Sequence, residues 1–385
     1  MSSSLKQTRL PVHAYLRDEV VHRYARLTEE GLYSLAPQEL FWQARYNFLK
    51  ERGYLLRPRY SPGWKPSWIG TNLDPTFCED SIRLLHYQVM DATRTSNGEL
   101  LAIKSFYKEE QEMDIAKFFS SMQDLMNHCV PIHEILPDPY DPELALMVMP
   151  YLRPCNDPEF ATVGDVIEFG LFFMHKHKVA HRDVAVDNIM MDAKPLYPSG
   201  HHPVQIGYTL DTLYPVSPLP RAGRKIQYYY IDFGLSMRFA PGASTLVVGD
   251  VGRDADVPEL SDTVPYDAFK VDIFALGNLY LKEFEQVRLR FLVHLAALWR
   301  LTTLQKYKNV EFLRSLIEPM VRRQPEQRPT AEQALQEWTK TRETLADSLF
   351  RWRLVPKAEP AIERVVNDTV AVAWEGIYHL KKLVG

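Results

Sequence analysis

The sequence predicts an α+β protein in which a small strand-rich region precedes a larger helical region. Two observations support this prediction. Short β-rich runs with hairpin chemistry between them occupy about residues 86–106. After "ALMVMPYL" (145–152), which is strand-like up to Pro150, the apolar residues recur mostly at helical spacing. The chain has 385 residues, 46% of them hydrophobic, so it can bury a sizeable core in one large domain or in two lobes.

The amino-acid composition argues against several classes of function and structure. The 45 basic and 49 acidic residues nearly balance, so no overall field favours nucleic acid or an anionic membrane. Three widely spaced cysteines suit a reducing compartment and give neither a disulfide framework nor a zinc pattern. The start of the chain lacks an apolar signal core, and no apolar run approaches the roughly eighteen residues of a membrane span. We therefore expect an intracellular protein, cytoplasmic or nuclear, that binds neither nucleic acid nor membrane. Its oligomeric state stays open.

Residues 1–75 are expected to form a helical extension and an arm. In the first helix Leu16, Val20, Tyr24 and Leu27 share one stripe, and a second helix begins at Pro37 and stops at Gly53. The following segment "RPRYSPGWKPSW" (57–68) is too rich in proline for a helix or a central strand. It is interpreted as an ordered arm or linker.

The strand-rich region contains "HYQVMDATR" and "ELLAIKSF", two strands joined by the turn "TSNG", and then a helix over 112–122. Within the helical region, 43 residues rich in Pro, Gly and Tyr separate Asn188 from Asp232. That is far longer than an ordinary loop of about a dozen residues, so about 193–226 is an insertion, functional or disordered. A further long loop is expected over 235–267.

The end of the chain, residues 346–385, is expected to be a helical extension. Its apolar residues recur at helical spacing in the segment "AIERVVNDTVAVAWEGIYHLKKLV". The helix either binds a partner or packs against the chain's own large helical region. We favour the second interpretation.

The residues that indicate chemistry lie in "HRDVAVDN" (181–188) and "YYYIDFGLS" (228–236). Asp183 and Asn188 stand five apart, and Asp232 follows an apolar strand. A carboxamide and a carboxylate at such positions are oxygen ligands suited to Mg²⁺ and its substrate phosphates. The remaining carboxylate, Asp183, can accept a proton from a hydroxyl.

These two motifs, in this order, resemble those of the eukaryotic protein kinase family. The resemblance covers roughly residues 80–340 and extends to "LLAIKSF", "VPELS", "KVDIFALGN" and "QRPTAEQAL". It implies a bilobal protein-kinase-like fold over 76–345, with a strand-rich N-lobe (76–150), a helical C-lobe (151–345), and use of ATP and Mg²⁺. The arm and the long insertion also look like a fungal branch of kinase-like proteins.

The resemblance assigns roles to individual residues. Asp183 would accept the substrate proton, Lys104 would bind phosphate, and Asn188 and Asp232 would hold the metal. Glu112 is the expected partner of Lys104, because Ile115, Ala116 and Phe119 follow it at the family's spacing. The adenine site would be formed by Met149 at the gatekeeper position, by Pro150, Tyr151 and Leu152 of the hinge, and by Val89 and Ala102.

Five further residues are expected to have structural roles. The glutamate of the Pro-Glu motif, here Glu259, pairs with the late arginine, here Arg328. Asp272 stands at the buried start of the central helix. His181 is expected to pack beneath the loop, and Arg182 to face the activation segment.

Three departures from the family pattern put activity in doubt. No glycine lies between Gly70 and Gly98, so the glycine-rich phosphate loop, expected near Ile82, Leu84 and Tyr87, is missing. The cation that protein kinases carry two or four residues after the catalytic aspartate is replaced by Ala185 and Asp187. The helix before His181, within 162–177, is one to two turns short.

The activation segment also lacks a phosphorylation site. No Ser, Thr or Tyr lies between Leu246 and Leu260. Asp250, Asp254 or Asp256 could instead pair permanently with Arg182.

Three functions remain open. The first is an ATP-dependent kinase that phosphorylates Ser or Thr of an unidentified protein substrate. The second is a pseudokinase that acts as a binding scaffold, as the missing glycines and cation suggest. The third and least favoured is a small-molecule phosphotransferase, because such enzymes usually lack the Asp-Phe-Gly, Pro-Glu and late Arg-Pro motifs.

Overall fold

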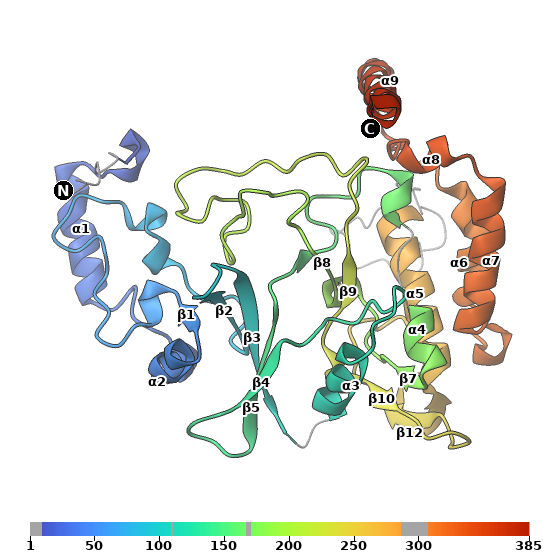
Figure 1. Ribbon diagram of the computed structural model, residues 1–385, viewed down its shortest axis with the longest axis horizontal. Coiled ribbons are helices and arrows are strands. Elements are labelled where there is room, and N and C mark those ends of the chain that lie inside the picture. Colours follow the sequence, from blue (N-terminus) through green and yellow to red (C-terminus); the bar gives the residue numbers. More distant parts are fainter. Residues whose placement is uncertain (1–9, 109–110, 167–170, 286–306, 385) are drawn as a thin grey trace, which may run out of the picture. The chain divides into compact units, whose positions relative to one another are not determined.

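The computed structural model describes residues 10–108, 111–166, 171–285 and 307–384. The chain folds into two compact units (Figure 1). The N-terminal unit comprises Met1–Glu109, Ile132–Tyr151 and Tyr197–Leu219, and the C-terminal unit comprises Glu110–Pro131, Leu152–Leu196 and Pro220–Gly385. The N-terminal unit contains the large sheet and the C-terminal unit most of the helices, as the α+β bilobal prediction requires.

A five-stranded antiparallel sheet in the order β1-β2-β3-β5-β4 forms the centre of the N-terminal unit. Its strands are β1 (Tyr54–Leu56), β2 (Val89–Arg94), β3 (Leu100–Tyr107), β4 (Glu134–Pro137) and β5 (Leu144–Pro150). The predicted hairpin is confirmed, and Gly98 in its turn has a φ of 73°, which favours glycine. The sequence did not predict β4, because four residues are too few to show an alternation.

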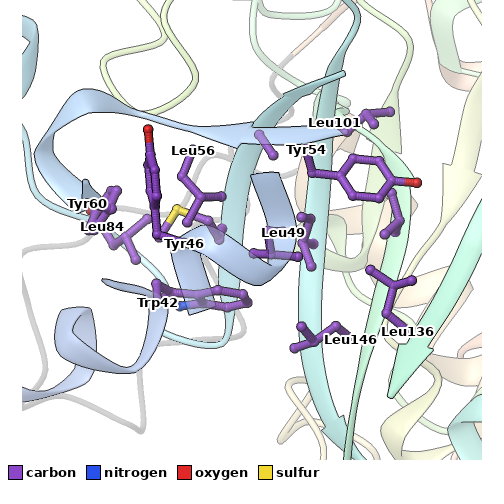
Figure 2. Packing of buried hydrophobic residues seen from close by; sticks show 14 residues of the cluster. Trp42, Tyr46, Leu49, Tyr54, Leu56, Tyr60, Leu84, Leu101, Leu136 and Leu146 are labelled. Atoms are coloured by element: carbon purple, nitrogen blue, oxygen red, sulfur yellow. The ribbon is translucent and has the colours of Figure 1, made fainter. Parts of the chain in front are cut away.

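One face of this sheet packs against helix α2 (Pro37–Glu51), which follows α1 (Asp18–Glu29). Trp42 and Leu49 of α2 are fully buried in a cluster with sheet residues (Figure 2). The sheet residues of this cluster include Met90, Ala92, Leu101, Ile103, Leu146 and Val148. Side chains alternate along a strand, so the neighbouring residues of β2, β3 and β5 point to the opposite face. Because α2 covers one face of the sheet, the alternate residues of these strands lie on the other face.

The connection between β1 and β2 is not a short turn. Residues 57–88 include the arm predicted at 57–68 and form one folded segment with 3₁₀ turns at Pro58–Tyr60, Pro75–Phe77 and Glu79–Ser81. From here on we call this whole segment the arm. The arm is anchored by Arg59, whose guanidinium binds Glu39 of α2 with Nε–Oε1 and Nη2–Oε2 distances of 3.0 and 3.1 Å. Both side chains are completely buried. Strand β1 thus comes from the segment expected to be an extension, and the arm is ordered.

Part of the long insertion folds onto the N-terminal unit. Within residues 197–219, the hydroxyl of Thr212 donates to the Phe77 carbonyl at 3.3 Å, and the His202 ring lies 3.4 Å from a carboxylate oxygen of Glu79. His13 Nε2 lies 2.9 Å from the Leu213 carbonyl oxygen. These contacts reach the arm and the N-terminal segment, so this part of the insertion is ordered.

The C-terminal unit consists of helices and small sheets. Its helices are α3 (Gln111–Ser120), α4 (Leu171–Lys176), α5 (Ala268–Tyr280), α6 (Arg314–Met320), α7 (Ala331–Thr344), α8 (Asp347–Arg351) and α9 (Ala361–Val384). Its strands are β6 (Arg153–Pro154), β7 (Val179–Ala180), β8 (Ile189–Met191), β9 (Tyr228–Tyr230), β10 (Met237–Arg238), β11 (Leu246–Gly249) and β12 (Ser261–Asp267). The sheets are β6-β8-β9, β10-β7 and β11-β12.

One expectation for this unit differs from the structure, and another extends beyond the described residues. Residues 235–267 are not a plain loop, because they contain β10 and the antiparallel pair of β11 and β12. The expected helix over 162–177 includes residues 167–170, which lie outside the described residues. Its described parts are a 3₁₀ turn at Val163–Val166 and helix α4.

The favoured interpretation of the C-terminal helix was wrong for the described residues. Ion pairs hold α9 by its polar side, where Glu375 binds Arg351 and Asp368 binds Arg353. Those of its apolar side chains that the structure describes face solvent instead of the large helical region, and the exposed fraction is 83% at Ile362 and 50% at Val370. Across the described residues, no helix combines the length and the hydropathy that crossing a membrane would take.

The buried Glu39–Arg59 pair generates a stability prediction. Glu39→Ala removes the partner of a completely buried guanidinium and also the side chain that accepts from the Ala36 N–H at the start of α2. Stranding a buried charge costs about 3–5 kcal/mol, so the melting temperature should fall markedly. Glu51→Ala, at the exposed end of the same helix, is the matched control and should change little. Equal melting temperatures for the two variants would contradict this account of the arm.

The same pair predicts a pH dependence. Burial alone would raise the pKa of Glu39, but the hydrogen bonds from Arg59 and from the Ala36 N–H hold that pKa below its usual value. The stabilisation is therefore complete above the unfolded-state pKa, about 4.3, and is lost as the pH falls through the lower folded-state pKa. The difference in unfolding free energy between wild type and Glu39→Ala should narrow on acidification below about pH 4. Denaturant titrations at several pH values measure it, and a constant difference would contradict the pKa direction.

Candidate active site

The loop that carries Asp183 is built around the carboxylate of Asp272 in α5. This carboxylate is fully buried and accepts hydrogen bonds from the backbone N–H groups of His181 and Arg182, both at 2.7 Å. The ring of His175 contributes a third contact at 2.8 Å. Arg182 has a φ of 64°, a left-handed conformation that is uncommon outside glycine. The two bonds to Asp272 hold the backbone in that conformation and so direct the next residue, Asp183.

His181 is a structural residue, as expected. Its ring is completely buried, with Nε2 at 3.1 Å from the Ile231 carbonyl oxygen, while Nδ1 accepts from the Asp183 N–H at 3.3 Å. Because Nδ1 is an acceptor, the ring proton lies on Nε2. Burial lowers the pKa of His181, which keeps the ring neutral. The ring therefore links the loop to Ile231, the residue directly before Asp232.

Asn188 fixes the side chain of Asp183. Its side-chain NH₂ group donates to the Asp183 backbone carbonyl at 2.9 Å and to the Asp183 carboxylate at 2.7 Å. The NH₂ group is the donor in both bonds, so the amide oxygen is the atom suited to a metal ion. Asn188 is buried, whereas about 10% of the Asp183 side chain is exposed.

Pairing of β8 with β9 brings Asp232 beside Asn188. Ile189 lies opposite Tyr230, and the Ile231 N–H donates to the Asn188 carbonyl at 3.0 Å. Asp232 itself has a φ of 62°. A Cβ atom on Gly234 would lie 3.5 Å from an Asp232 carboxylate oxygen and 3.9 Å from a Glu112 carboxylate oxygen. The buried Glu112 of α3 therefore faces the Asp-Phe-Gly turn.

These oxygen atoms suit magnesium. Within the described part of the chain, no cluster of three or more His, Cys, Asp or Glu side chains could hold a metal ion. A metal here would depend on Asn188, Asp232 and phosphate oxygens. Mg²⁺ is commonly bound in this way, by one or two protein oxygens together with substrate phosphates.

The remaining expected nucleotide residues lie mostly on neighbouring strands of the N-terminal unit. Val89 is opposite Lys104, Ala102 is opposite Met149, and Leu101 is opposite Pro150. Lys104, Ala102, Val89 and Met149 alternate with members of the cluster packed on α2, so they share the opposite face of the sheet. This face also carries Asp91, a residue the sequence analysis did not consider.

Asp91 is the centre of a buried polar contact in the N-terminal unit. It lies opposite Ala102 and pairs with Arg57 at the start of the arm, at 3.1 Å. Burial raises the pKa of Asp91, although the Arg57 guanidinium opposes this. Arg57 also donates to the Ile82 carbonyl at 2.9 Å. These contacts fix the arm at the end of β1, where the family's glycine-rich turn would begin.

The hinge residues and the lysine partner complete the expected set. Tyr151 follows β5, and its N–H donates to the Leu100 carbonyl at 3.4 Å. Leu152 is buried and belongs to the C-terminal unit. Lys104 and Glu112 belong to different units, and their pairing stays a prediction. The same holds for the catalytic and binding roles of all these residues.

The structure brings Arg253, which no sequence motif indicated, to the loop that carries Asp183. The Arg253 backbone N–H donates to one Asp183 carboxylate oxygen at 2.6 Å, and its Nε lies 3.4 Å from the other. Its Nη1 lies 3.5 Å from the carboxylate of Asp187. Arg253 is 70 positions from Asp183, and no local pattern marks it. The one hint in the sequence was that Ala185 and Asp187 stand where the family carries a cation.

The suggested pairing of an activation-segment aspartate with Arg182 was wrong for the described contacts. Asp254 accepts from the Asn278 side chain at 2.8 Å, and Asp256 lies 2.8 Å from Lys282. Arg182 donates instead to the Val248 carbonyl at 3.0 Å. A backbone carbonyl of β11 takes the place that the carboxylate was expected to occupy.

The pairing of Glu259 with Arg328 is present in the structure. Both terminal nitrogens of Arg328 bind the Glu259 carboxylate, and the Nη2–Oε2 distance is 2.8 Å. Arg328 is fully buried at its side chain and also donates to the Lys270 carbonyl at 2.8 Å. Its guanidinium lies 4.7 Å from the centre of the Phe274 ring. The activation segment is thereby tied to α5 and to the segment before α7.

Comparison with known proteins gives one family. The family model described as the protein kinase domain matches residues 87–339, which is more than half of the chain. No protein with a curated description matches the chain.

The Glu259–Arg328 pair generates a stability prediction. Arg328→Ala leaves Glu259 without its partner and leaves several backbone carbonyls without their donor, so about 3–5 kcal/mol of unfolding free energy should be lost. Thermal melting measures the effect. Arg322→Ala is the matched control. Arg322 is exposed, and only its backbone carbonyl contacts Arg328, so the substitution leaves that contact in place. An unchanged melting temperature for Arg328→Ala would refute the structural role of the pair.

Proposed function

Since the chain belongs to the protein kinase family, we propose that it transfers the γ-phosphoryl group of ATP to a serine or threonine hydroxyl of a protein substrate. The observation that supports catalysis most strongly is the arrangement of Asp183, Asn188 and Asp232. Asp183 is held by Asn188, and Asp232 lies beside them at the end of β9. A binding scaffold has no need of this arrangement.

Each residue has a defined task in the proposed reaction. The oxygen of the substrate hydroxyl attacks the γ-phosphorus while Asp183 accepts the hydroxyl proton. The bond from that phosphorus to the bridging oxygen breaks, ADP leaves, and the proton remains on the Asp183 carboxylate. Asn188 keeps the carboxylate oriented through the 2.7 Å bond from its NH₂ group. Mg²⁺, held by Asn188 and Asp232, would neutralise phosphate charge.

Serine and threonine are the proposed acceptors because the loop lacks a tyrosine-kinase feature. Tyrosine kinases carry an arginine four residues after the catalytic aspartate, and this chain has Asp187 there. The lysine typical of serine and threonine kinases is also missing, so the proposal rests on the absence of the tyrosine-specific residue.

We also propose that nucleotide binding is weak. In the family a glycine-rich turn brings backbone N–H groups close to the phosphates, whereas here the arm follows β1. Lys104, the hinge and Mg²⁺ would then supply most of the affinity, so saturation is expected only at ATP concentrations on the order of millimolar. The same feature supports the second candidate, a pseudokinase that acts as a binding scaffold.

Substituting Asp183 or Asp232 by asparagine should impair different steps, phosphate transfer in one variant and nucleotide binding in the other. Asp183→Asn removes the proton acceptor, so transfer from labelled Mg-ATP to a mixed peptide library should fall by about 10²-fold or more while Mg-ATP still binds. Asp232→Asn removes a metal ligand, so Mg²⁺-dependent binding of a fluorescent ATP analogue should itself weaken. Phosphoamino-acid analysis identifies the acceptor.

Asp192→Asn, the same change outside the loop, is the control and should behave as wild type. If wild type transfers no phosphate and both variants bind the analogue as wild type does, the scaffold function replaces the proposed one.

A further inference from the structure

The catalytic loop carries two carboxylates in the place where protein kinases have a carboxylate and a cation. Asp183 and Asp187 are both acidic, and Ala185 between them has no charge. Arg253 contacts both carboxylates, through its Nε and its Nη1 respectively. It is therefore a cation that offsets these two carboxylates in the folded chain.

The backbone around Arg253 holds it there independently of the side chain. Its N–H donates to Asp183 at 2.6 Å. The preceding residue, Gly252, has a φ of 155°, and a Cβ atom there would lie 3.6 Å from the Arg182 carbonyl oxygen. The following residue, Asp254, binds Asn278 and Lys282 near the end of α5. The segment is thus fixed on both sides of Arg253.

The guanidinium itself is only loosely held. Its distances to the two carboxylates are 3.4 and 3.5 Å, longer than the usual 2.7–2.9 Å of a charge-assisted hydrogen bond. About 47% of the side chain is exposed. Arginine has five N–H donors in a planar fork that matches phosphate geometry, so it can bind a phosphate while it stays close to Asp183.

We propose that Arg253 supplies the missing cation and binds the phosphoryl group during its transfer. This inference rests on the proposed function. Asp183 accepts the hydroxyl proton as before, and Arg253 stabilises the negative charge that develops on the phosphoryl oxygens. A charge held beside the reacting oxygen acts mainly on the rate of transfer and less on peptide binding.

The same contacts allow a contrary role, in which Arg253 blocks Asp183 and inhibits the enzyme. The exposed and loosely held guanidinium favours the cation role, since a block would be expected to pair tightly with the carboxylate. The two roles predict opposite effects of removing the side chain.

Kinetics of three variants distinguish these roles. Arg253→Ala should lower kcat by about 10²-fold with the KM for peptide changed less than about twofold, and Arg253→Lys should retain part of the activity. Adding Ala185→Lys to Arg253→Ala should restore activity, because it returns a cation to the position that the family uses. Arg322→Ala controls for the loss of one exposed arginine. Higher activity of Arg253→Ala would show a block, and unchanged activity would also overturn the inference.

A binding measurement tests the inference even if wild type transfers no phosphate to any peptide. Aluminium fluoride with ADP and Mg²⁺ imitates the phosphoryl group during transfer, and wild type should melt at a higher temperature with it than with ADP and Mg²⁺ alone. Arg253→Ala should lose this additional shift and keep the shift with ADP and Mg²⁺. Retention of the additional shift by Arg253→Ala would refute the role of Arg253, whereas its absence in wild type would refute the proposed transfer itself and with it this inference. Melting without ligand verifies that the variant is folded.

Discussion

The buried carboxylate of Asp272 is the constraint on which the loop carrying Asp183 depends. Removing a carboxylate from water is costly unless hydrogen bonds replace the lost hydration, and here two backbone N–H groups and a histidine ring do so. In return, the carboxylate holds Arg182 in a left-handed conformation. The direction of Asp183 and its bond from Asn188 follow from that conformation. One residue earlier, the His181 ring contacts Ile231, just before Asp232.

A second set of constraints orders the N-terminal unit. Helix α2 packs on one face of the sheet, so the residues between those in the core, among them Lys104 and Ala102, point away from it. The arm replaces a short glycine turn, and buried arginines stabilise it. Arg59 pairs with Glu39 and Arg57 with Asp91. The arm is thus anchored by side chains, which a glycine turn does not have.

The activation segment is held by charges that are part of the chain. Arg328 binds Glu259, Lys282 binds Asp254, and Arg253 lies between Asp183 and Asp187. Its central part has no hydroxyl to phosphorylate, and these permanent contacts order it without a phosphate. Among the described contacts, the Arg182 side chain binds the Val248 carbonyl of this segment and none of its aspartates.

The sequence by itself determined the features that depend on local pattern. Alternating strands and a Gly-containing turn predicted the β2–β3 hairpin, and the spacing of Asp183, Asn188 and Asp232 predicted a family that the domain match confirmed. Only the tertiary structure decided which distant residues meet. It brought Arg253 to Asp183, paired β1 with β2 across the arm, and turned the apolar side of α9 to solvent. Such contacts join residues far apart in sequence, where neither periodicity nor spacing specifies a partner.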